Sequence, residues 1–244
     1  MTETAPSSDE LRGRIAEVRR LIDESARRAE REPESIRLIA VTKTHPAQII
    51  RRAIEAGLSD LGENRVQEAD EKIAAVGRGS ARWHLIGHLQ ANKARRAVAL
   101  FDMIHSLDSA SLARRLNRLC EETGRETLPV LVQVDLAGEA TKSGVSEEDL
   151  PSVVEAIGAC EHLSLSGLMT LPPFLEDVEH VRPYFARLRV LRDRLLERGA
   201  FGAGQGELSM GMSHDYEVAI AEGATMVRVG TAIFGERGTR AISE

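Results

Sequence analysis

The sequence predicts an α/β protein whose fold class is a single (β/α)₈ TIM barrel. The chain has 244 residues, close to the roughly 250 that are typical of this barrel. From residue 36 onward a unit of short apolar strand, loop and amphipathic helix recurs, which implies a parallel sheet with right-handed crossovers. The first apolar run, Ile36–Val41, is nearly continuous, as expected for a strand buried on both faces. An open doubly wound sheet is the alternative architecture.

An additional N-terminal helix is predicted before the barrel. Residues 1–8 contain few apolar side chains and are expected to form a disordered tail, so that one domain spans residues 9–244. Ser7–Glu10 has capping-box spacing. Apolar residues follow at helical intervals to about residue 31, where Glu32–Pro33 stops the helix. The arginines of this helix are interspersed with acids, which favours a solvated face over a phosphate-binding stripe.

The repeating units then follow in order along the chain. Strands are predicted near 36–42, 58–63, 82–87, 103–107, 129–135, 163–170, 207–211 and 225–230, and helices near 46–57, 65–76, 90–99, 109–123, 146–158, 179–198 and 214–222. A short piece after Thr231 completes the series. The glycine-rich stretch 202–206 follows a helix and precedes a strand, so it is a connector and not a dinucleotide fingerprint.

Composition narrows the function classes. The net charge of −6 gives no global basic field for nucleic acid. No apolar run approaches the roughly 20 residues that span a bilayer, and no signal peptide precedes the first helix. The two cysteines, Cys120 and Cys160, lack metal-type spacing and are interpreted as structural thiols in a reducing cytoplasm. The sequence thus predicts a cytoplasmic protein with neither nucleic acid nor membrane as a partner.

Candidate functional residues lie where strands end, because barrel active sites form at the carboxyl ends of the strands. Lys43 follows the first strand, and Pro46 opens the next helix. A reactive amine is expected at such a position, although a solvated lysine fits it as well. His84 and His88 share a strand face but lie about 13 Å apart by strand rise, so no metal site is expected from them.

The last two strand ends are candidates for a phosphate site. In barrels, phosphate often binds after strands seven and eight, at the N-terminus of a short helix. Ser213 follows strand seven and is expected to act as an N-cap and hydroxyl donor. Gly230–Thr231 ends strand eight with bare backbone N–H groups, which favour anions. The alternative is that Gly230 only permits a turn and Ser213 only caps a helix.

Arg228 is predicted to point into the barrel. Strand alternation places Met226, Arg228 and Gly230 on one face, and the valines of the other face suit the helical layer. A buried arginine needs acceptors, and pairing with an inward acid such as Glu63 is the structural option. A lysine together with a phosphate cradle suggests a phosphorylated carbonyl compound, either pyridoxal 5′-phosphate or a phosphosugar in a class I aldolase.

These residues belong to segments that resemble the pyridoxal phosphate homeostasis proteins, the YggS/PROSC family. The resemblance covers roughly residues 36 to 237. The matching segments are Leu38–Thr44, Gly62–Glu68, Trp83–Lys93, Ile104–Asp108, Lys142–Val145, Gly167–Thr170, Leu208–Asp215 and Val229–Gly235. Departures from the family pattern are Thr42 for serine, Arg65 for tyrosine and Asp135 for asparagine.

The resemblance implies a fold type III pyridoxal-phosphate barrel, like the N-terminal domain of alanine racemase. It implies a Schiff base between the cofactor and Lys43, with Asn64 beside the cofactor and Arg228 near the pyridine nitrogen. Ser213, Gly230 and Thr231 would hold the phosphate. Met210, from the same motif as Ser213, completes the predicted cofactor site.

The resemblance also implies a monomer that carries or buffers pyridoxal phosphate without substantial turnover, affects amino-acid and keto-acid balance, and delivers the cofactor to apo-enzymes. Arg228 stays charged and would disfavour protonation of the ring nitrogen, which makes the ring a poorer electron sink. Racemases add a tyrosine base from a further domain, for which no room is expected here, and Tyr184 and Tyr216 lie in predicted helices. The alternatives are a racemase or lyase using the same cofactor, a class I aldolase-type enzyme, and an interaction module built on the arginine-rich helix.

Overall fold

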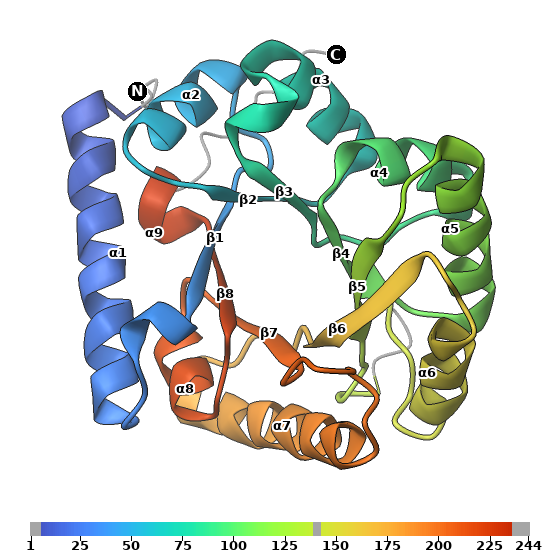
Figure 1. Ribbon diagram of the computed structural model, residues 1–244. Coiled ribbons are helices and arrows are strands. Elements are labelled where there is room, and N and C mark those ends of the chain that lie inside the picture. Colours follow the sequence, from blue (N-terminus) through green and yellow to red (C-terminus); the bar gives the residue numbers. More distant parts are fainter. Residues whose placement is uncertain (1–5, 139–142, 236–244) are drawn as a thin grey trace, which may run out of the picture.

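The fold is a closed barrel of eight parallel strands, each paired with its neighbour in chain order, as the sequence predicts (Figure 1). A computed structural model describes residues 6–138 and 143–235. The helices surround the strands, and α1 (Ser8–Arg28) stands beside the ring on the side of β1 and α8. The predicted N-terminal tail falls mostly on residues 1–5, which lie outside the described residues, as do Lys142 and residues 236–244.

The strands and helices alternate along the chain. The strands are β1 (Arg37–Val41), β2 (Asp60–Glu63), β3 (Arg82–Leu85), β4 (Met103–Leu107), β5 (Leu128–Gln133), β6 (Leu163–Met169), β7 (Glu207–Met212) and β8 (Met226–Val229). The outer helices are α2 (Ala47–Glu55), α3 (Val66–Val76), α4 (Ala94–Leu100), α5 (Ala110–Thr123), α6 (Leu150–Gly158), α7 (Arg182–Glu197) and α8 (Tyr216–Ala221), and α9 (Thr231–Phe234) follows β8.

Most boundaries differ from the prediction by a few residues. The helix expected over 146–158 begins only at Leu150, and the one expected over 179–198 divides into the 3₁₀ turn η4 (Val178–Val181) and α7. Pro183 lies in the first turn of α7, where its missing N–H is tolerated. The stretch 202–206 connects α7 to β7, as expected of a loop.

The first and last strands meet and close the barrel. Ala40 of β1 pairs with Val229 of β8 on one side and with Leu61 of β2 on the other. Since parallel strands bring their carboxyl ends to the same rim, the residues that follow β1, β2 and β8 lie next to one another at the mouth. The register therefore determines which of the predicted site residues can cooperate.

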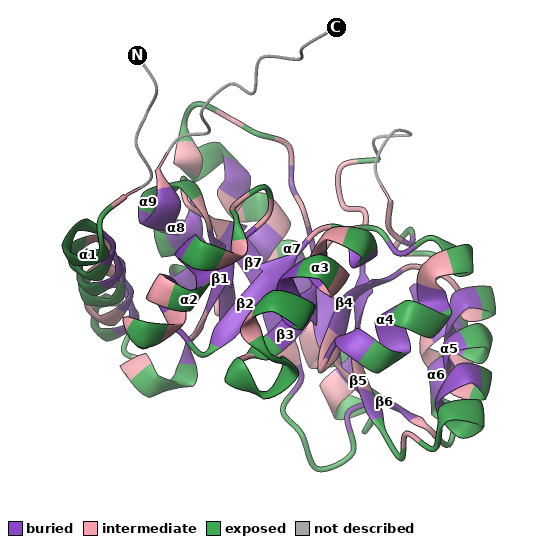
Figure 2. Cartoon of the chain, turned by 90° about the horizontal axis from the view of Figure 1, so that it is seen from above, coloured by how far each residue is buried: buried purple, intermediate pink, exposed green. Residues whose placement is uncertain are grey.

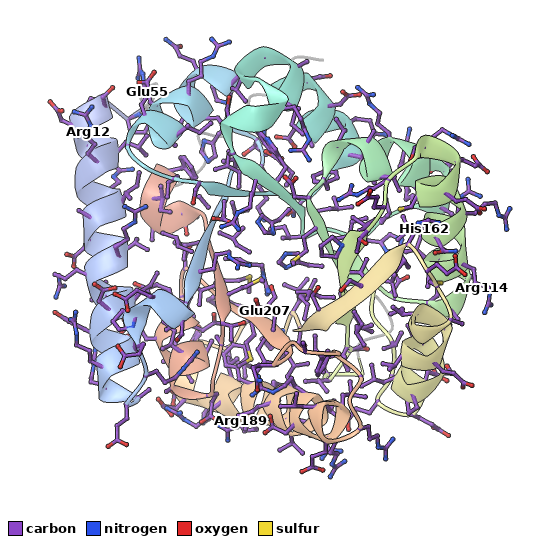
Figure 3. The ribbon with its side chains drawn as sticks, viewed as in Figure 1. Arg12, Glu55, Arg114, His162, Arg189 and Glu207 are labelled. Carbon is purple, nitrogen blue, oxygen red and sulfur yellow. The ribbon has the colours of Figure 1, made fainter. Side chains whose placement is uncertain are left out.

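Strand alternation divides the buried side chains into two sets. The larger apolar cluster lies between strands and helices and includes Ala40, Leu61 and Val229. A small cluster of Ile39, Leu131, Met169 and Met226 is separate from it. The ring of strands is filled with side chains (Figure 3), and most of the strand residues are buried (Figure 2). Polar side chains take up much of the remaining interior, namely Asp60, His84, His105, Ser209 and Arg228.

The N-terminal helix forms as the sequence predicts. Ser7 and Glu10 make a reciprocal capping box, and α1 begins at Ser8. Its buried face packs against α2, α8 and α9. Two arginines bind carbonyl oxygens at the ends of neighbouring helices: Arg19 of α1 reaches Gly57 after α2, and Arg31, just after α1, reaches two carbonyls at the end of α8.

Four other arginines of α1 are exposed to solvent, namely Arg12, Arg20, Arg27 and Arg28. Arg12, Arg20 and Arg27 pair with acids of the same helix, and Arg28 pairs with Glu217. Figure 3 shows Arg12 on the outer side of the helix. These contacts favour the solvated-face interpretation over a phosphate-binding stripe. Among the residues that the structure describes, none of the helices is long and apolar enough to cross a membrane.

Candidate functional site

Lys43 lies two residues beyond the end of β1, at the rim of the barrel, and is half-buried. The next residue, Thr44, has a φ of 69°, a left-handed conformation that is uncommon for a residue with a branched side chain. Glu68 of α3 accepts a hydrogen bond from the Thr44 N–H. Lys72, one helical turn further along α3, donates to the Thr42 carbonyl over 2.6 Å. The backbone on both sides of Lys43 is thus tied to one helix.

Lys72 is itself buried between two carboxylates. Its Nζ lies 2.7 Å from Oε1 of Glu63 and 2.6 Å from Oε1 of Glu68. Burial raises the pKa of Glu63, although Lys72 and the Thr42 hydroxyl oppose that shift. Oε2 of Glu63 is buried and makes no hydrogen bond within the described part of the chain. A buried ion pair of this kind is costly to break from one side only.

Glu63 faces the helical layer, so the suggested pairing of Arg228 with Glu63 is wrong. Along β2, Asp60 points to the barrel interior, where it contacts His84, and Glu63 three positions later points to α3, where it contacts Lys72. The alternation of a strand explains the difference. Arg228 does point inward, as predicted. Its guanidinium donates to Oγ of Ser209 over 2.7 Å and to the Thr170 carbonyl over 2.9 Å.

The residues expected to form a phosphate cradle meet at the ends of β7 and β8. The Gly230 N–H donates to Oγ of Ser213 over 3.0 Å, which joins the two strand ends. The expectation that Ser213 acts as an N-cap is wrong, because α8 starts at Tyr216 and its N-cap is Asp215. Thr231 is the first residue of α9, directly after Gly230, and it is exposed at the rim.

Contacts connect this cradle to the Lys43 segment. A Cβ placed on Gly230 would lie 3.4 Å from both Cβ and the carbonyl oxygen of Val41, two residues before Lys43. The ring of His45 lies 4.8 Å from the ring of Phe234 in α9. Gly230 thus lies in van der Waals distance of the end of β1, and the lysine and the cradle lie on neighbouring strands of the same mouth.

Asn64 and Met210 occupy different environments. Asn64 follows β2 and lines an open cavity of about 1600 Å³ with residues of the β1, β2 and β3 loops, including Thr44, His45 and Arg65. Met210 is buried in the apolar cluster that faces the helices. Its side chain therefore packs in the core between strands and helices, and a part for Met210 in cofactor binding stays a prediction.

In the part of the chain that the structure describes, His88 and the two cysteines do not form a metal site with the residues of the mouth. β3 ends at Leu85, so His88 lies in a loop, where its Nδ1 is 3.1 Å from Asp108. No group of side chains suited to a metal ion occurs among the described residues. Cys120 and Cys160 are buried free thiols, and burial raises the pKa of each.

Sequence analysis overlooked several polar residues around the site. Lys72 and Glu68 have the i, i+4 spacing of an ordinary surface ion pair, and only the packing of α3 on β2 buries them. Asp60 and Ser209 are polar residues inside apolar strands. That position was a usable signal, because strand alternation places both on the inward face.

Comparison with known proteins gives consistent matches. The sequence model of the alanine racemase N-terminal domain family matches residues 16–238. A pyridoxal phosphate homeostasis protein of Aquifex aeolicus is 42% identical over 224 residues, covering 92% of this chain and 97% of that protein. One of Pseudomonas aeruginosa is 44% identical over 223 residues, covering 91% and 94%.

Solved structures show the same pattern. PipY of Synechococcus elongatus PCC7942, in a structure with PLP bound, has a TM-score of 0.81 and 39% identity, covering 92% of this chain and all of that one. Alanine racemase of Corynebacterium glutamicum has a TM-score of 0.67 at 18% identity, covering 97% of this chain and 63% of that one, and so shares the fold.

Proposed function

Because the chain belongs to the alanine racemase N-terminal domain family and, within it, to the pyridoxal phosphate homeostasis proteins, we propose that it binds pyridoxal 5′-phosphate through Lys43 and acts as a carrier or buffer of this cofactor. The observation that carries the proposal is the adjacency of Lys43 and the Ser213–Gly230 junction on the neighbouring strands β1 and β8. The cofactor has an aldehyde at one end and a phosphate at the other, which matches an amine and an anion cradle on one mouth.

The residues present fit such a cofactor in chemical terms. Lys43 supplies the amine, and its backbone is fixed on both sides by Lys72 and Glu68. Gly230 leaves room for a phosphate because it has no side chain, and Ser213 and Thr231 bring hydroxyl groups to the same junction. Helix N-termini and bare backbone N–H groups are favourable for phosphate. In this proposal Asn64 lies beside the ring, and the Met210 segment contributes through its backbone.

In this proposal Arg228 controls the protonation of the cofactor's ring nitrogen. When bound, pyridoxal phosphate supplies an electron sink whose strength depends on protonation of its ring nitrogen. A guanidinium beside that nitrogen opposes protonation by like-charge repulsion. Arg228 therefore holds the proton off the ring and weakens carbanion chemistry. This supports holding and release of the cofactor without substantial turnover.

We extend the proposal to partners and place. The chain would act as a monomer in the cytoplasm and hand the cofactor to apo-enzymes that require it. The buried free thiols Cys120 and Cys160 support a reducing compartment. Transfer to an apo-enzyme at a rate above that of release into solution supports delivery, and transfer at the release rate supports storage alone.

Titration with pyridoxal phosphate tests the proposal. The wild-type protein is expected to gain a visible absorbance band at one equivalent, and Lys43→Ala is expected to lose it. Lys93→Ala is the matched control, because Lys93 is a second lysine near the mouth, where it lines the same cavity as Asn64; this variant should keep the band. A band that survives in Lys43→Ala would exclude Lys43 as the attachment site. Exchange of the α-hydrogen of amino acids in deuterated water at useful rates would favour a racemase or lyase instead.

A further inference from the structure

A continuous chain of hydrogen bonds crosses the barrel interior from Arg228 to Asp60. Arg228 contacts Oγ of Ser209 at 2.7 Å, and the same oxygen lies 2.9 Å from Nδ1 of His105. Nε2 of His105 lies 3.0 Å from Nδ1 of His84, whose Nε2 lies 3.0 Å from Oδ1 of Asp60. All five residues are buried. They come from β8, β7, β4, β3 and β2, so the chain crosses the barrel interior between β7 and β4 and then follows neighbouring strands to β2.

The chain also links the two ends of the barrel. Asp60 is the first residue of β2 and therefore lies at the floor of the barrel, the end opposite the mouth. There it is also contacted by Ser59, Arg82 and Arg37. Arg228 reaches the carbonyl of Thr170, which follows β6 at the mouth. An ionised acid at the floor is thus connected to a guanidinium at the mouth through three side chains.

Hydrogen-bond accounting fixes the direction of this chain. A guanidinium only donates, so Ser209 accepts from Arg228 and has a single hydrogen of its own to give. That hydrogen goes to Nδ1 of His105. Burial, with Arg228 contributing, lowers the pKa of His105 well below its usual value, so His105 is neutral. Because its Nδ1 accepts from Ser209, His105 carries its proton on Nε2.

The same accounting continues to Asp60. His105 donates from Nε2 to Nδ1 of His84, which leaves the proton of His84 on Nε2, facing Asp60. Burial alone would raise the pKa of Asp60, but hydrogen bonds from His84, Ser59 and Arg82 outweigh it and lower this pKa to about 2. Asp60 is therefore ionised and can only accept. Every donor in the chain then has its acceptor.

The reverse arrangement is less favourable. If His84 were doubly protonated, it would donate to His105, and His105 would donate from Nδ1 to Ser209. The Ser209 hydroxyl hydrogen would then have no acceptor among its contacts in the described residues. A second positive charge would also join Arg228 in the interior, at a cost in desolvation.

We propose that Asp60 is the final acceptor of the hydrogen-bond chain that begins at Arg228. This chain, in which every donor points toward Asp60, holds the guanidinium charged and oriented at the mouth. Ser209, His105 and His84 are then positioning residues that transmit the charge of Asp60. Asp215 is the other acid that acts on Arg228, but it does so through space, with its Oδ1 accepting from the Met212 N–H. The consequence for the cofactor ring rests on the proposed function; the direction of the chain does not.

Nitrogen-15 NMR of the histidine rings in the cofactor-free protein tests the chain. Both His84 and His105 are expected as neutral rings protonated on Nε2. Asp60→Asn removes the fixed acceptor, because an amide can either accept or donate, and the single-tautomer pattern should be lost at His105 as well as at His84. Asp102→Asn is the matched control, since Asp102 contacts Arg78 and Trp83 and lies outside the chain; it should leave both rings unchanged.

Two outcomes would overturn the inference: an imidazolium at His84 in the wild type, or an unchanged His105 ring in folded Asp60→Asn. The first needs no variant, so it holds even if the substitution prevents folding. In the loaded protein, Asp60→Asn should weaken pyridoxal phosphate binding about tenfold, within the range of coupling between distant sites, and shift the visible band. Normal binding with an unshifted band in Asp60→Asn would contradict only the inference, whereas failure of the wild type to bind would contradict only the proposed function.

Discussion

Lys72 is the single side chain on which the geometry around Lys43 depends most. It joins two buried or half-buried carboxylates to the carbonyl that precedes Lys43. Lys72 is buried, and among the residues that the structure describes its ammonium donates to these three acceptors. Removing the ammonium while leaving Glu63 in place would strand an uncompensated charge in the interior.

We therefore expect Lys72→Met to lower the free energy of unfolding by about 3 to 5 kcal/mol, the usual cost of breaking a buried pair from one side. Denaturant unfolding of the cofactor-free protein measures it. The double variant Glu63→Gln with Lys72→Met should recover much of the loss, because no buried charge is left unpaired. A double variant less stable than Lys72→Met would contradict this account of the pair.

Asp60 gives a prediction in acid. Its pKa falls from 3.8 to about 2 on folding, so its contribution to stability is complete above pH 4 and is lost as the pH falls toward 2. The stability difference between wild type and Asp60→Asn should shrink by about 1 kcal/mol between pH 6 and pH 3. Urea unfolding at both values measures this, and a difference that stays constant would show that Asp60 is not stabilised as a carboxylate.

At the scale of single residues, the sequence predicted candidate residues better than it predicted the contacts between them. Alternation was enough to turn Arg228 inward and to place Gly230 on the same side. The same alternation along β2 places Asp60 and Glu63 on opposite faces, and the expected pairing of Arg228 with Glu63 did not take this into account. The clamp of Lys72 and Glu68 depends on how α3 sits on β2, and no local pattern contains that information.

Helix α1 shows how an element outside the repeating unit is fixed to the barrel. An apolar face at helical spacing covers α2, α8 and α9. Arg31 completes the contact by donating to the carbonyls of Ile220 at 3.0 Å and Ala224 at 2.8 Å. These carbonyls lie at the end of α8, where helices leave acceptors unsatisfied and where a cation is favoured.

Arg31→Ala is therefore expected to destabilise the protein by about 2 kcal/mol, within the range for hydrogen bonds to a charged group. Arg27→Ala is the control, because the Arg27 side chain is 66% exposed and pairs only weakly within its own helix, and it should change stability by less than about 0.5 kcal/mol. Thermal or denaturant unfolding of both variants measures the difference. Equal effects would mean that the α8 carbonyls do not hold α1.

The β7–β8 junction gives a prediction about binding. Ser213 accepts from Gly230 and brings a hydroxyl group to the proposed phosphate position. Ser213→Ala should weaken pyridoxal phosphate binding about tenfold, since a hydrogen bond to a charged group is worth about 1.5 kcal/mol or more. Binding of pyridoxal, which lacks the phosphate, is the control and should be unchanged. Equal weakening of both ligands would place the effect outside the phosphate cradle.

At the scale of the whole molecule, the repeating pattern determines the architecture. Eight apolar strands separated by amphipathic helices predicted the closed parallel barrel, and the order of pairing follows from right-handed crossovers. The ends of the elements were less predictable. α6 begins only at Leu150 and the turn η4 precedes α7, because loops and 3₁₀ turns replace helix that the apolar spacing alone would allow. The sequence could place the candidate residues at one mouth because the carboxyl ends of parallel strands share one rim.

The interior could not be read in the same way. Its polar chain is assembled from residues on five strands, and each of them is isolated in its own segment. Three of its contacts join adjacent strands, and closure of the barrel adds the contact between Ser209 and His105 across the interior. The tertiary structure thus adds a buried electrostatic connection from the floor to the mouth, while the sequence supplies its members.

The most direct test of the central claim is the site of covalent attachment. The chain has four lysines, Lys43, Lys72, Lys93 and Lys142, so borohydride reduction of the protein with one equivalent of pyridoxal phosphate, followed by peptide mass mapping, distinguishes them cleanly. We predict a single reduced phosphopyridoxyl group on the peptide that contains Lys43. Modification of another lysine in its place, or a protein that stays colourless and unmodified, would contradict the account.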